Sequence, residues 1–366
     1  MAAALDRAMA TVIVLGLGHV GRPLAAVIAR AHDVWGHDID PAAVQGAKGP
    51  QVEPALGSLL DRPSLHLGLP DEPADVVVVA VPTPMGPDGA DTRAVVAASR
   101  DGAERLRPGG LLLVVSTCPV GTARELAQAL GRPVATSPER GMPGRMVEEM
   151  LTQPRLVGGT TPEVTEHAVA FVRSWAVGAV EPVAPEEAEL CKLVENSWRD
   201  VSIAFANDLA TTAEALGLDP HRVVRLAEGH PRVQLARPGI GVGGHCLPVD
   251  PQFLPDTMVM SAVARQRNQA RTQSQIERIR AEAAARGAQT IGVLGLAYKP
   301  DTADARNAPA VVIASALGAV AHDPFVAVSE VHQGSLDEVL GCDLVVKLVG
   351  HRAYQGLSVG LDLTGA

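Results

Sequence analysis

Residues 11–21 read Thr11-Val-Ile-Val-Leu-Gly16-Leu-Gly-His-Val-Gly21 and set the first half of the fold. The β-branched, apolar run at residues 11–15 is typical of a strand buried on both faces of a parallel sheet. It leads into a Gly-x-Gly-x-x-Gly sequence, and an apolar helix is predicted from there through Arg30. A strand, a glycine-rich turn and a helix in this order predict the start of a dinucleotide-binding domain.

Each residue of the glycine-rich turn has an expected role. Gly16 makes the turn, Gly18 lets the backbone approach a pyrophosphate, and Gly21 lets the helix pack close to its strand. His19 and Val20 lie between the last two glycines. The backbone N–H groups of a helix N-terminus face phosphate charge there. We therefore expect these five residues to bind the cofactor.

A carboxylate follows the glycines at the distance that ribose binding requires. The second short strand, residues 33–38, ends in Asp38, about 20 positions beyond the turn. A carboxylate at this place accepts hydrogen bonds from an adenosine ribose and repels a 2′-phosphate. The cofactor is therefore predicted to be NAD rather than NADP.

Polar residues follow three further predicted strands, which span residues 75–81, 111–115 and 133–136. In an open α/β sheet the ligand lies at the carboxyl ends of the strands. A proline-rich turn explains residues 82–84 nearly as well as a cofactor contact does. The candidate ligand contacts after these strands are Thr83, Thr117, Glu139 and Arg140.

The segments between and after these strands are predicted to be mostly helical. We expect a helix and a loop over residues 54–69, a helix over 92–105 and a turn at 108–110. Apolar positions at helical spacing predict a long helical region over residues 185–235 and a connecting helix over 262–286. These last two regions form a predicted central helical domain.

Two pairs of polar residues in the first helical region are spaced by four positions. Lys192 and Asn196 share one helix face, and Glu195 and Arg199 form another such pair. Charged residues on helices are mostly solvated surface. Only proximity to a reactive group would make Lys192 and Asn196 functional.

Residues 239–251 read Gly-Ile-Gly-Val-Gly-Gly-His-Cys-Leu-Pro-Val-Asp-Pro and present one sulfur, that of Cys246. The glycines permit close approach of another molecule, and Pro248 and Pro251 fix the exit of the loop around Asp250. A thiolate in this setting can attack a carbonyl carbon and hold a substrate covalently. The alternative is a small, buried apolar Cys246 in a glycine-rich turn.

The pattern of the N-terminal part returns near the C-terminus. A strand over residues 290–296, a loop, a helix over 308–317 and strands over 319–322 and 344–349 predict a second Rossmann-like unit. It lacks the third glycine, so a second dinucleotide is not expected. Its loop carries Lys299 and Arg306, and these suit phosphate binding as a point charge and a planar fork respectively. The predicted fold is α/β, with two Rossmann-like doubly wound domains (residues 1–183 and 288–366) joined by a central helical domain (184–287).

Composition excludes several classes of function. The 366 residues carry a formal net charge of −10, which argues against nucleic acid as a partner. The four cysteines lie far apart without a CxxC pair, so we expect free thiols and no metal site. Cys118 is predicted to be a packed core thiol. No apolar run reaches the roughly 18 residues of a membrane span, and residues 1–9 do not resemble a signal peptide. A cytoplasmic location is expected.

Seven motifs together resemble the UDP-glucose/GDP-mannose dehydrogenase family in order and approximate spacing. Three departures are Ser202, where the family usually has Asn, Asn307-Ala308, where it usually has Glu-Ser, and a chain shorter than most relatives, notably around residues 41–70 and at the C-terminus. The motifs are Gly16-x-Gly-x-x-Gly21, Val81-Pro-Thr-Pro84, Ser116-Thr-Cys-Pro-Val-Gly121, Ser137-Pro-Glu-Arg140, Lys192-Leu-Val-Glu-Asn196, Gly243-Gly-His-Cys246 and Gly295-Leu-Ala-Tyr-Lys-Pro300.

Within the family the chain looks most like the branch that oxidises UDP-N-acetyl-D-mannosamine at C6. The segments that carry this likeness are residues 138–144, 230–232 and 241–246. UDP-N-acetylglucosamine and UDP-glucose stay open as alternative substrates. The resemblance implies a four-electron oxidation of an alcohol to a carboxylate by two NAD in succession. It further implies that Cys246 forms a thiohemiacetal with the aldehyde, then a thioester that water hydrolyses.

The resemblance also implies roles for individual residues. Lys192 and Asn196 would stabilise the oxyanion, Asp250 and Thr117 would hold the water, and Glu139 would act as general base. The implied substrate contacts are Arg140, Arg232, Gly243, His245, Lys299 and Arg306. Family membership implies a homodimer or larger oligomer through the central helices. A non-catalytic nucleotide-sugar binding protein, or a simple two-electron hydroxyacid dehydrogenase, would not need this set of residues.

Overall fold

The computed structural model describes residues 9–46, 53–87, 89–142 and 144–364. The chain divides into two compact units with their border between Val194 and Glu195. Each unit contains one largely parallel sheet with apolar cores on both faces. The predicted α/β class with two doubly wound sheets is therefore confirmed. The borders of the three domains at residues 183/184 and 287/288 stay predictions.

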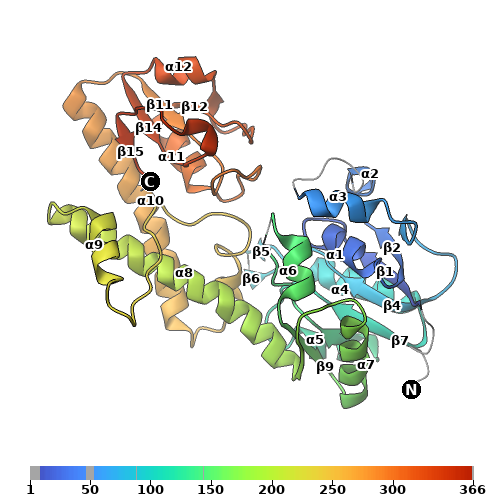
Figure 1. Ribbon diagram of the computed structural model, residues 1–366. Helices are drawn as coiled ribbons and strands as arrows, with labels where there is room; N and C mark the ends of the chain where they lie inside the picture. The colour runs from blue at the N-terminus through green and yellow to red at the C-terminus, as the bar shows by residue number, and fades with distance from the viewer. Residues whose placement is uncertain (1–8, 47–52, 88, 143, 365–366) are drawn as a thin grey trace. The chain divides into compact units, whose positions relative to one another are not determined.

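An eight-stranded sheet forms the first unit, in the order β10-β9-β8-β7-β4-β1-β2-β3 (Figure 1). Neighbouring strands are parallel except for β8 and β9. The part β3-β2-β1-β4-β7-β8 has the strand order of a dinucleotide-binding sheet. The strands are β1 (Thr11–Leu15), β2 (Asp33–His37), β3 (Leu65–Leu67), β4 (Ala74–Val79), β7 (Leu106–Val114), β8 (Ala135–Thr136), β9 (Arg155–Gly159) and β10 (Val180–Val183).

Alternate residues of the central strands face two different cores, because side chains along a strand point to opposite faces. On β1, Val12 and Val14 pack in the core that contains α1 (Gly21–Ile28). Ile13 and Leu15 pack in the core that contains Val95 of α4 (Arg93–Glu104). The other elements of this unit are α2 (Pro41–Gly46), α3 (Pro54–Leu60), the hairpin β5 (Met85–Gly86) and β6 (Gly89–Ala90), α5 (Thr122–Leu130), α6 (Met146–Thr152) and α7 (Pro162–Arg173).

Two local predictions differ from the structure of the first unit. The turn expected at residues 108–110 is wrong, because β7 continues through them. Gly109 there has φ +78, and the register with β4 shifts between Ala74 and Val76. The loop expected at the end of residues 54–69 contains the short strand β3. Both errors have one cause: pairing with a neighbouring strand overrides local turn propensity.

A five-stranded parallel sheet in the order β13-β12-β11-β14-β15 forms the second unit together with helices. On β11, Val293 packs in the core with Ile313 of α11, and Leu294 packs on the opposite face with Val339 of α12. The elements are β11 (Ile291–Leu294), α11 (Pro309–Leu317), β12 (Val320–His322), β13 (His332–Gln333), α12 (Leu336–Leu340), β14 (Leu344–Lys347) and β15 (Leu361–Asp362), with single 3-10 turns at Asp250–Phe253 and Arg352–Tyr354.

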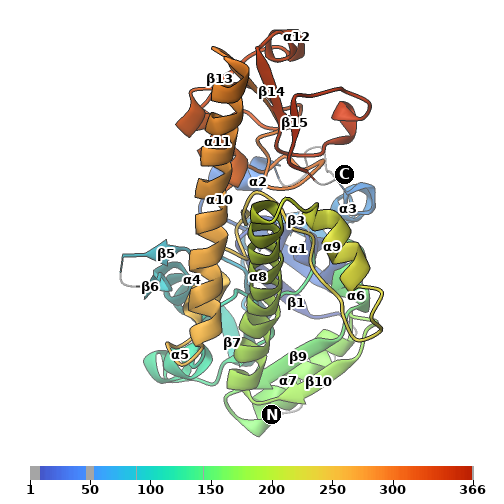
Figure 2. The same ribbon diagram turned by 90° about the vertical axis from the view of Figure 1, so that its left-hand side faces the viewer.

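The predicted helical region 185–235 is two helices, α8 (Pro185–Ala215) and α9 (Pro220–Ala227), and residues 228–235 are not helical. The connecting helix is α10 (Val259–Arg286). From residue 195 onward α8 lies beside α10 (Figure 2). Polar pairs join these two helices: Asp200 with Arg265, Asn207 with Asn268, Asp208 with Arg267, and Glu214 with Arg271 and Arg278.

Across the described ranges, every helix is too short or too polar to cross a bilayer. The same ranges contain no cluster of three His, Cys, Asp or Glu side chains arranged to hold a metal ion. The segment of residues 1–8, which bears on the signal-peptide expectation, lies outside the described residues.

Candidate active site

The glycine-rich turn after β1 has the geometry of a phosphate cradle. Gly16 has φ +93, and a Cβ there would lie 2.6 Å from the carbonyl oxygen of Ala80. A Cβ on Gly21 would overlap the carbonyl oxygen of Gly16, so both positions need glycine for the fold itself. A Cβ on Gly18 would meet nothing within 4 Å. Its glycine therefore leaves space for a ligand, which fits a bound pyrophosphate. His19 and Val20 complete the turn, and Gly18 and His19 are exposed.

Asp38 lies directly after β2, beside the glycine-rich turn. The backbone N–H of Leu17 donates a hydrogen bond to Oδ2 of Asp38 at 2.7 Å, and the N–H of Asp40 donates to Oδ1 at 2.9 Å. These bonds hold the carboxylate at the carboxyl end of β2. Each oxygen keeps a second lone pair, which is what a ribose diol needs.

The polar residues after β4 and β7 come together at one edge of the sheet, because these strands are parallel neighbours. The hydroxyl of Ser116 donates to the carbonyl oxygen of Val81 at 2.7 Å and so ties the two strand ends. The Thr83 hydroxyl lies 4.0 Å from the sulfur of Cys118. Cys118 is buried in the core next to α4 and α5, as predicted. Thr117 is half-buried between Ser116 and Cys118.

Glu139, after β8, is a buried carboxylate with donors on both oxygens. Oε1 accepts the backbone N–H groups of Arg140 at 2.8 Å and Gly141 at 2.7 Å. Oε2 accepts from the guanidinium of Arg155 at 2.9 Å, and the two side chains are only 5% and 6% exposed. The Arg155 guanidinium also donates to the carbonyl oxygen of Met150 and lies over the Trp175 ring. Sequence reasoning missed Arg155, because a single Arg at the start of a strand gives no signal of burial.

Arg140 is half-buried, and its guanidinium donates to the carbonyl oxygen of Pro154 at 2.7 Å. This contact joins the segment after β8 to the segment before β9. The backbone bonds to Glu139 and this side-chain bond fix the conformation of residues 139–141.

Glu189 of α8 is a further buried carboxylate, and unlike Glu139 it was not predicted from the sequence. It accepts the backbone N–H of Gly121 at 2.6 Å and of Ala123 at 2.8 Å, at the start of α5. Burial raises its pKa to about 7, although these two hydrogen bonds oppose the shift. Glu189 therefore anchors the loop that begins at Ser116 to the long helix. Lys192, one turn further on α8, is half-buried.

Asn196 contacts the cysteine loop directly. Its side-chain amide donates to Oδ2 of Asp250 at 2.5 Å, and both side chains are buried. The carbonyl oxygen of Cys246 accepts the N–H groups of Val249 at 3.0 Å and Asp250 at 2.8 Å. A tight turn thus places Cys246 and Asp250 close together, and Asn196 fixes that turn on α8. Cys246 itself is half-buried.

The start of the cysteine loop is held by α8 and α10. The side-chain oxygen of Asn207 accepts the N–H of Gly239 at 2.9 Å, and Arg271 donates to the carbonyl oxygen of Gly239 at 3.0 Å. Thr272 donates to the carbonyl oxygen of Ile240 at 2.9 Å. The buried polar groups of the helix pair therefore determine where this loop leaves the helices.

The middle of the cysteine loop packs against the loop at residues 298–309. A Cβ on Gly243 would lie 2.7 Å from the carbonyl oxygen of Asn307, and Gly244 (φ +94) packs against the Tyr298 ring. The N–H of Gly244 donates to the carbonyl oxygen of Arg306 at 2.8 Å, and the Asn307 amide donates to the carbonyl oxygen of Gly244 at 3.0 Å. Asn307 has φ +51, a conformation that Asn tolerates better than Glu.

Cations gather around this contact between the two loops. Arg306 forms an ion pair with Asp304 at 2.6 Å, and its guanidinium lies 3.1 Å from Nδ1 of His245. The hydrogen bond to Asp304, and further the charge of Cys246, raise the pKa of Arg306. A cation beside a thiolate favours the reactive, ionised sulfur.

Lys299 lines a cavity of about 270 Å³ at the carboxyl ends of β11 and β14. Burial, and then the positive charge of Arg199, lower the pKa of Lys299. Arg199 is therefore a further cation near this cavity. The sequence had predicted Arg199 only as a helix-surface residue that pairs with Glu195. The cavity also adjoins Gly241, Tyr298, Pro309, Val349 and Thr364.

Arg232, the remaining predicted substrate contact, is exposed in the segment after α9.

The chain matches three models of one family over most of its length. These are the NAD binding domain over residues 10–176, the central domain over 186–273 and the UDP binding domain over 292–362 of the UDP-glucose/GDP-mannose dehydrogenases. The chain belongs to the UDP-glucose/GDP-mannose dehydrogenase family. It is an NAD-dependent UDP-sugar dehydrogenase, and the predicted enzyme class, cofactor and UDP-sugar ligand class are confirmed.

Relatives and solved structures in this family are similar along nearly the whole chain. The NDP-N-acetyl-D-galactosaminuronic acid dehydrogenase of Ralstonia nicotianae is 35% identical over 340 residues, covering 85% of this chain and 80% of that protein. The UDP-N-acetyl-D-mannosamine dehydrogenase of Escherichia coli K12 is 34% identical and covers 94% of each chain. A UDP-D-ManNAc dehydrogenase structure from Pyrococcus horikoshii has a TM-score of 0.87 at 32% identity, covering 95% of this chain and 91% of that chain.

Proposed function

We propose that this dehydrogenase oxidises the C6 alcohol of a UDP-N-acetylhexosamine, with UDP-N-acetyl-D-mannosamine as the first candidate, to the uronate. The observation that carries the proposal is the packing of the Cys246 loop on the loop that holds Lys299 and Arg306. This arrangement supports a nucleophilic sulfur next to groups that bind a nucleoside diphosphate. The Escherichia coli and Pyrococcus relatives are named for UDP-N-acetylmannosamine.

NAD supplies a hydride acceptor for each of the two oxidations. The residues proposed to hold it are the glycine-rich turn at residues 16–21, Asp38, Thr83 and Thr117. The turn supports this because Gly18 has open space where its Cβ would be, and Asp38 is fixed beside it by Leu17. Thr83 and Thr117 follow parallel neighbouring strands at the edge where a ligand of such a sheet lies.

Cys246 is the proposed nucleophile. Its thiolate adds to the C6 aldehyde left by the first hydride transfer, forming a C–S bond, and the carbonyl oxygen takes a proton. Loss of this hydroxyl proton and of the C6 hydride then gives a thioester. Attack by water breaks the C–S bond and releases the carboxylate and the thiolate.

The remaining catalytic roles follow from charge and hydrogen bonding. Lys192 and Asn196 are proposed to stabilise the oxyanions that form at C6, as a cation and an amide donor. Asp250 and Thr117 are proposed to hold the hydrolytic water. Glu139 is proposed as general base for thioester hydrolysis, with Arg155 and two N–H groups holding its carboxylate in one orientation.

The UDP-sugar is proposed to bind through Lys299 and Arg306 at the diphosphate, with the cavity at the ends of β11 and β14 for the nucleotide. The guanidinium of Arg306 lies 3.1 Å from Nδ1 of His245, and Gly243 of the same loop lets the backbone pack closely against Asn307. Arg140 and Arg232 are the proposed contacts to the rest of the substrate.

We further propose that the enzyme is a homodimer or larger oligomer formed through the central helices. Trp198 and Phe205 of α8 are 69% and 60% exposed and lie seven positions apart, so they share one face of the helix. An exposed aromatic face of this kind is typical of an interface. The cytoplasmic location stays a prediction.

Substrate choice is tested by measuring kcat/KM of the purified enzyme with NAD and each of UDP-N-acetylmannosamine, UDP-N-acetylglucosamine and UDP-glucose. The proposal expects kcat/KM to be highest with UDP-N-acetylmannosamine. A preference for UDP-glucose would contradict the N-acetylhexosamine assignment. The absence of turnover with all three would contradict the proposed substrate class.

A further inference from the structure

The glycine turn of the second unit repeats the hydrogen bonds of the first. Gly16 donates its N–H to the carbonyl oxygen of His37, and Gly295 donates to that of His322. The next N–H in each turn donates to the acid after the second strand: Leu17 to Asp38 at 2.7 Å, and Leu296 to Asp323 at 2.6 Å. Asp323 thus occupies the position that Asp38 has in the NAD-binding unit.

Asp323 differs from Asp38 because protein donors surround it. Its Oδ2 accepts from the N–H groups of Leu296 and Ala297 and from Nε2 of His351 at 3.0 Å. Its Oδ1 accepts two more backbone N–H groups, those of Phe325 and Val326. Burial opposes ionisation, but the bond from His351 and the backbone donors outweigh it and hold the pKa of Asp323 at about 2. This carboxylate is therefore a structural anchor and not a ribose ligand.

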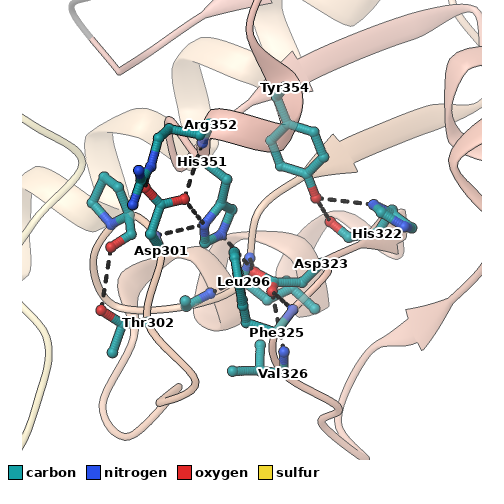
Figure 3. A network of polar contacts seen from close by, with 12 residues as sticks. Leu296, Asp301, Thr302, His322, Asp323, Phe325, Val326, His351, Arg352 and Tyr354 are labelled. Atoms are coloured by element: carbon teal, nitrogen blue, oxygen red, sulfur yellow. Dashed lines mark hydrogen bonds and ion pairs between the residues drawn. The ribbon is translucent and has the colours of Figure 1, made fainter. Parts of the chain in front are cut away.

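His351 joins this anchor to the loop that carries Lys299 (Figure 3). Its ring is fully buried, and Nδ1 accepts the backbone N–H of Asp301 at 2.8 Å. Nδ1 is then the acceptor and Nε2 carries the proton that it donates to Asp323. One imidazole in one neutral tautomer therefore links Asp323 to Asp301.

These bonds fasten the loop on both sides of Lys299. Two residues before it, the N–H of Ala297 is bound by Asp323, and two residues after it, the N–H of Asp301 is bound by His351. Asp301 has φ +53, a conformation that costs energy for a residue other than glycine and needs such support. The Asp301 carboxylate is held in turn by the N–H and guanidinium of Arg352.

We propose that His351 is a positioning residue for the UDP site: through Asp323 and Asp301 it fixes the backbone on either side of Lys299 and so sets the ammonium group for the diphosphate. This inference rests on the proposed role of Lys299 in binding UDP. His351 does not itself touch the substrate.

Two substitutions test the two ring nitrogens of His351 separately. His351→Gln keeps a donor near the position of Nε2 and loses the acceptor for Asp301. His351→Asn keeps an acceptor near the position of Nδ1 and loses the donor to Asp323. Tyr354→Phe is the matched control. It removes a hydroxyl of the same cluster that donates to the His322 carbonyl oxygen at 2.7 Å and lies 2.9 Å from Nδ1 of His322, on the side of His351 away from Asp301 (Figure 3).

The test measures the Kd of UDP alone by calorimetry on the full-length enzyme, together with KM for the UDP-sugar, KM for NAD and kcat. Losing one hydrogen bond that orders the loop should weaken UDP binding about three- to tenfold in His351→Gln and His351→Asn. Tyr354→Phe should bind UDP as the wild type does. The values of kcat and of KM for NAD should stay within about twofold in all three variants.

A second measurement asks whether the effect passes through Lys299. In a Lys299→Ala background, His351→Gln should weaken UDP binding no further, because the group that it positions is gone. UDP affinity equal to wild type in the folded single variants would overturn the inference, as would an undiminished additional loss in the Lys299→Ala background. Should His351→Asn fail to fold, His351→Gln, which keeps a donor to the Asp323 anchor, supplies both measurements. Failure of the wild-type enzyme to bind UDP would instead overturn the proposed function, which is a distinguishable result.

Discussion

The amide of Asn196 donates a hydrogen bond of 2.5 Å to the carboxylate of Asp250, and both side chains are buried. Asn196 lies on α8, whereas Asp250 ends the tight turn that begins at Cys246. This bond therefore sets the cysteine turn on the helix that also carries Lys192. The helix and the loop are separate in sequence, so this contact brings Asn196 together with Cys246 and Asp250, three of the proposed catalytic residues.

Asn196→Ala should therefore harm both stability and catalysis. Removing the donor leaves a buried carboxylate with one hydrogen bond fewer, which should lower the free energy of unfolding by about 1–3 kcal/mol. Loss of an oxyanion donor should lower kcat about 100-fold. Urea unfolding and steady-state kinetics measure the two effects. Asp250→Asn keeps the shape of the side chain, so a kcat near wild type for that variant would contradict the role of its charge.

The buried pair of Glu139 and Arg155 predicts a sharp difference between single and double substitutions. Arg155→Met leaves the Glu139 charge buried without its cation and should destabilise the protein by about 3–5 kcal/mol. Combining it with Glu139→Gln removes that charge and should restore much of the stability, without restoring thioester hydrolysis. Chemical unfolding of the two single variants and the double variant tests this. If Arg155→Met lowered the unfolding free energy equally in the wild type and in Glu139→Gln, the two side chains would not be energetically coupled.

Two glycines of the NAD turn should respond differently to the same methyl group. Gly18→Ala adds a Cβ in open space, so the protein should fold normally but bind NAD at least about tenfold more weakly, because the methyl group occupies the pyrophosphate position. Gly21→Ala adds a Cβ that overlaps the carbonyl oxygen of Gly16, so it should destabilise the fold itself. Thermal unfolding and NAD titration distinguish them. Normal NAD affinity in Gly18→Ala would argue against this cradle.

Glu189 predicts a pH dependence of stability. Its pKa rises to about 7 in the folded protein, from 4.5 for the ordinary side chain, because of burial. Between these values the folded state keeps the proton and the unfolded state has lost it, so stability from this group falls as pH rises. The slope is at most about 1.4 kcal/mol per pH unit. The unfolding free energy of the wild type should therefore fall relative to that of Glu189→Gln as the pH rises from 5 to 7. A difference that is constant over this range would refute the assignment.

Local sequence patterns predicted the parallel strands, the glycine turn and the long helices, because these depend on period and composition. The turn expected at residues 108–110 failed because β7 pairs with β4 beyond it. The burial of ionisable groups could not be predicted from the sequence for a similar reason. Arg155, Glu189 and His351 acquire their partners only when distant segments fold together, and their types alone predict exposed residues.

The same limit applies to the candidate site. The glycines, Cys246 and the strand-end polar residues were found from motifs and spacing. The bond between Asn196 and Asp250 joins residues 54 positions apart, and no local pattern indicates it. The contact of Asn307 with Gly244 spans 63 positions, and no local pattern indicates it either.

The most direct test of the central claim is the amount of NADH formed per UDP-sugar when the sugar is limiting and NAD is in excess, for the wild type and for Cys246→Ala. Covalent catalysis by Cys246 predicts two NADH per sugar and a uronate product for the wild type, and at most one NADH per sugar without uronate for Cys246→Ala. Two NADH per sugar from Cys246→Ala at an undiminished rate, or only one from the wild type, would contradict the thioester route.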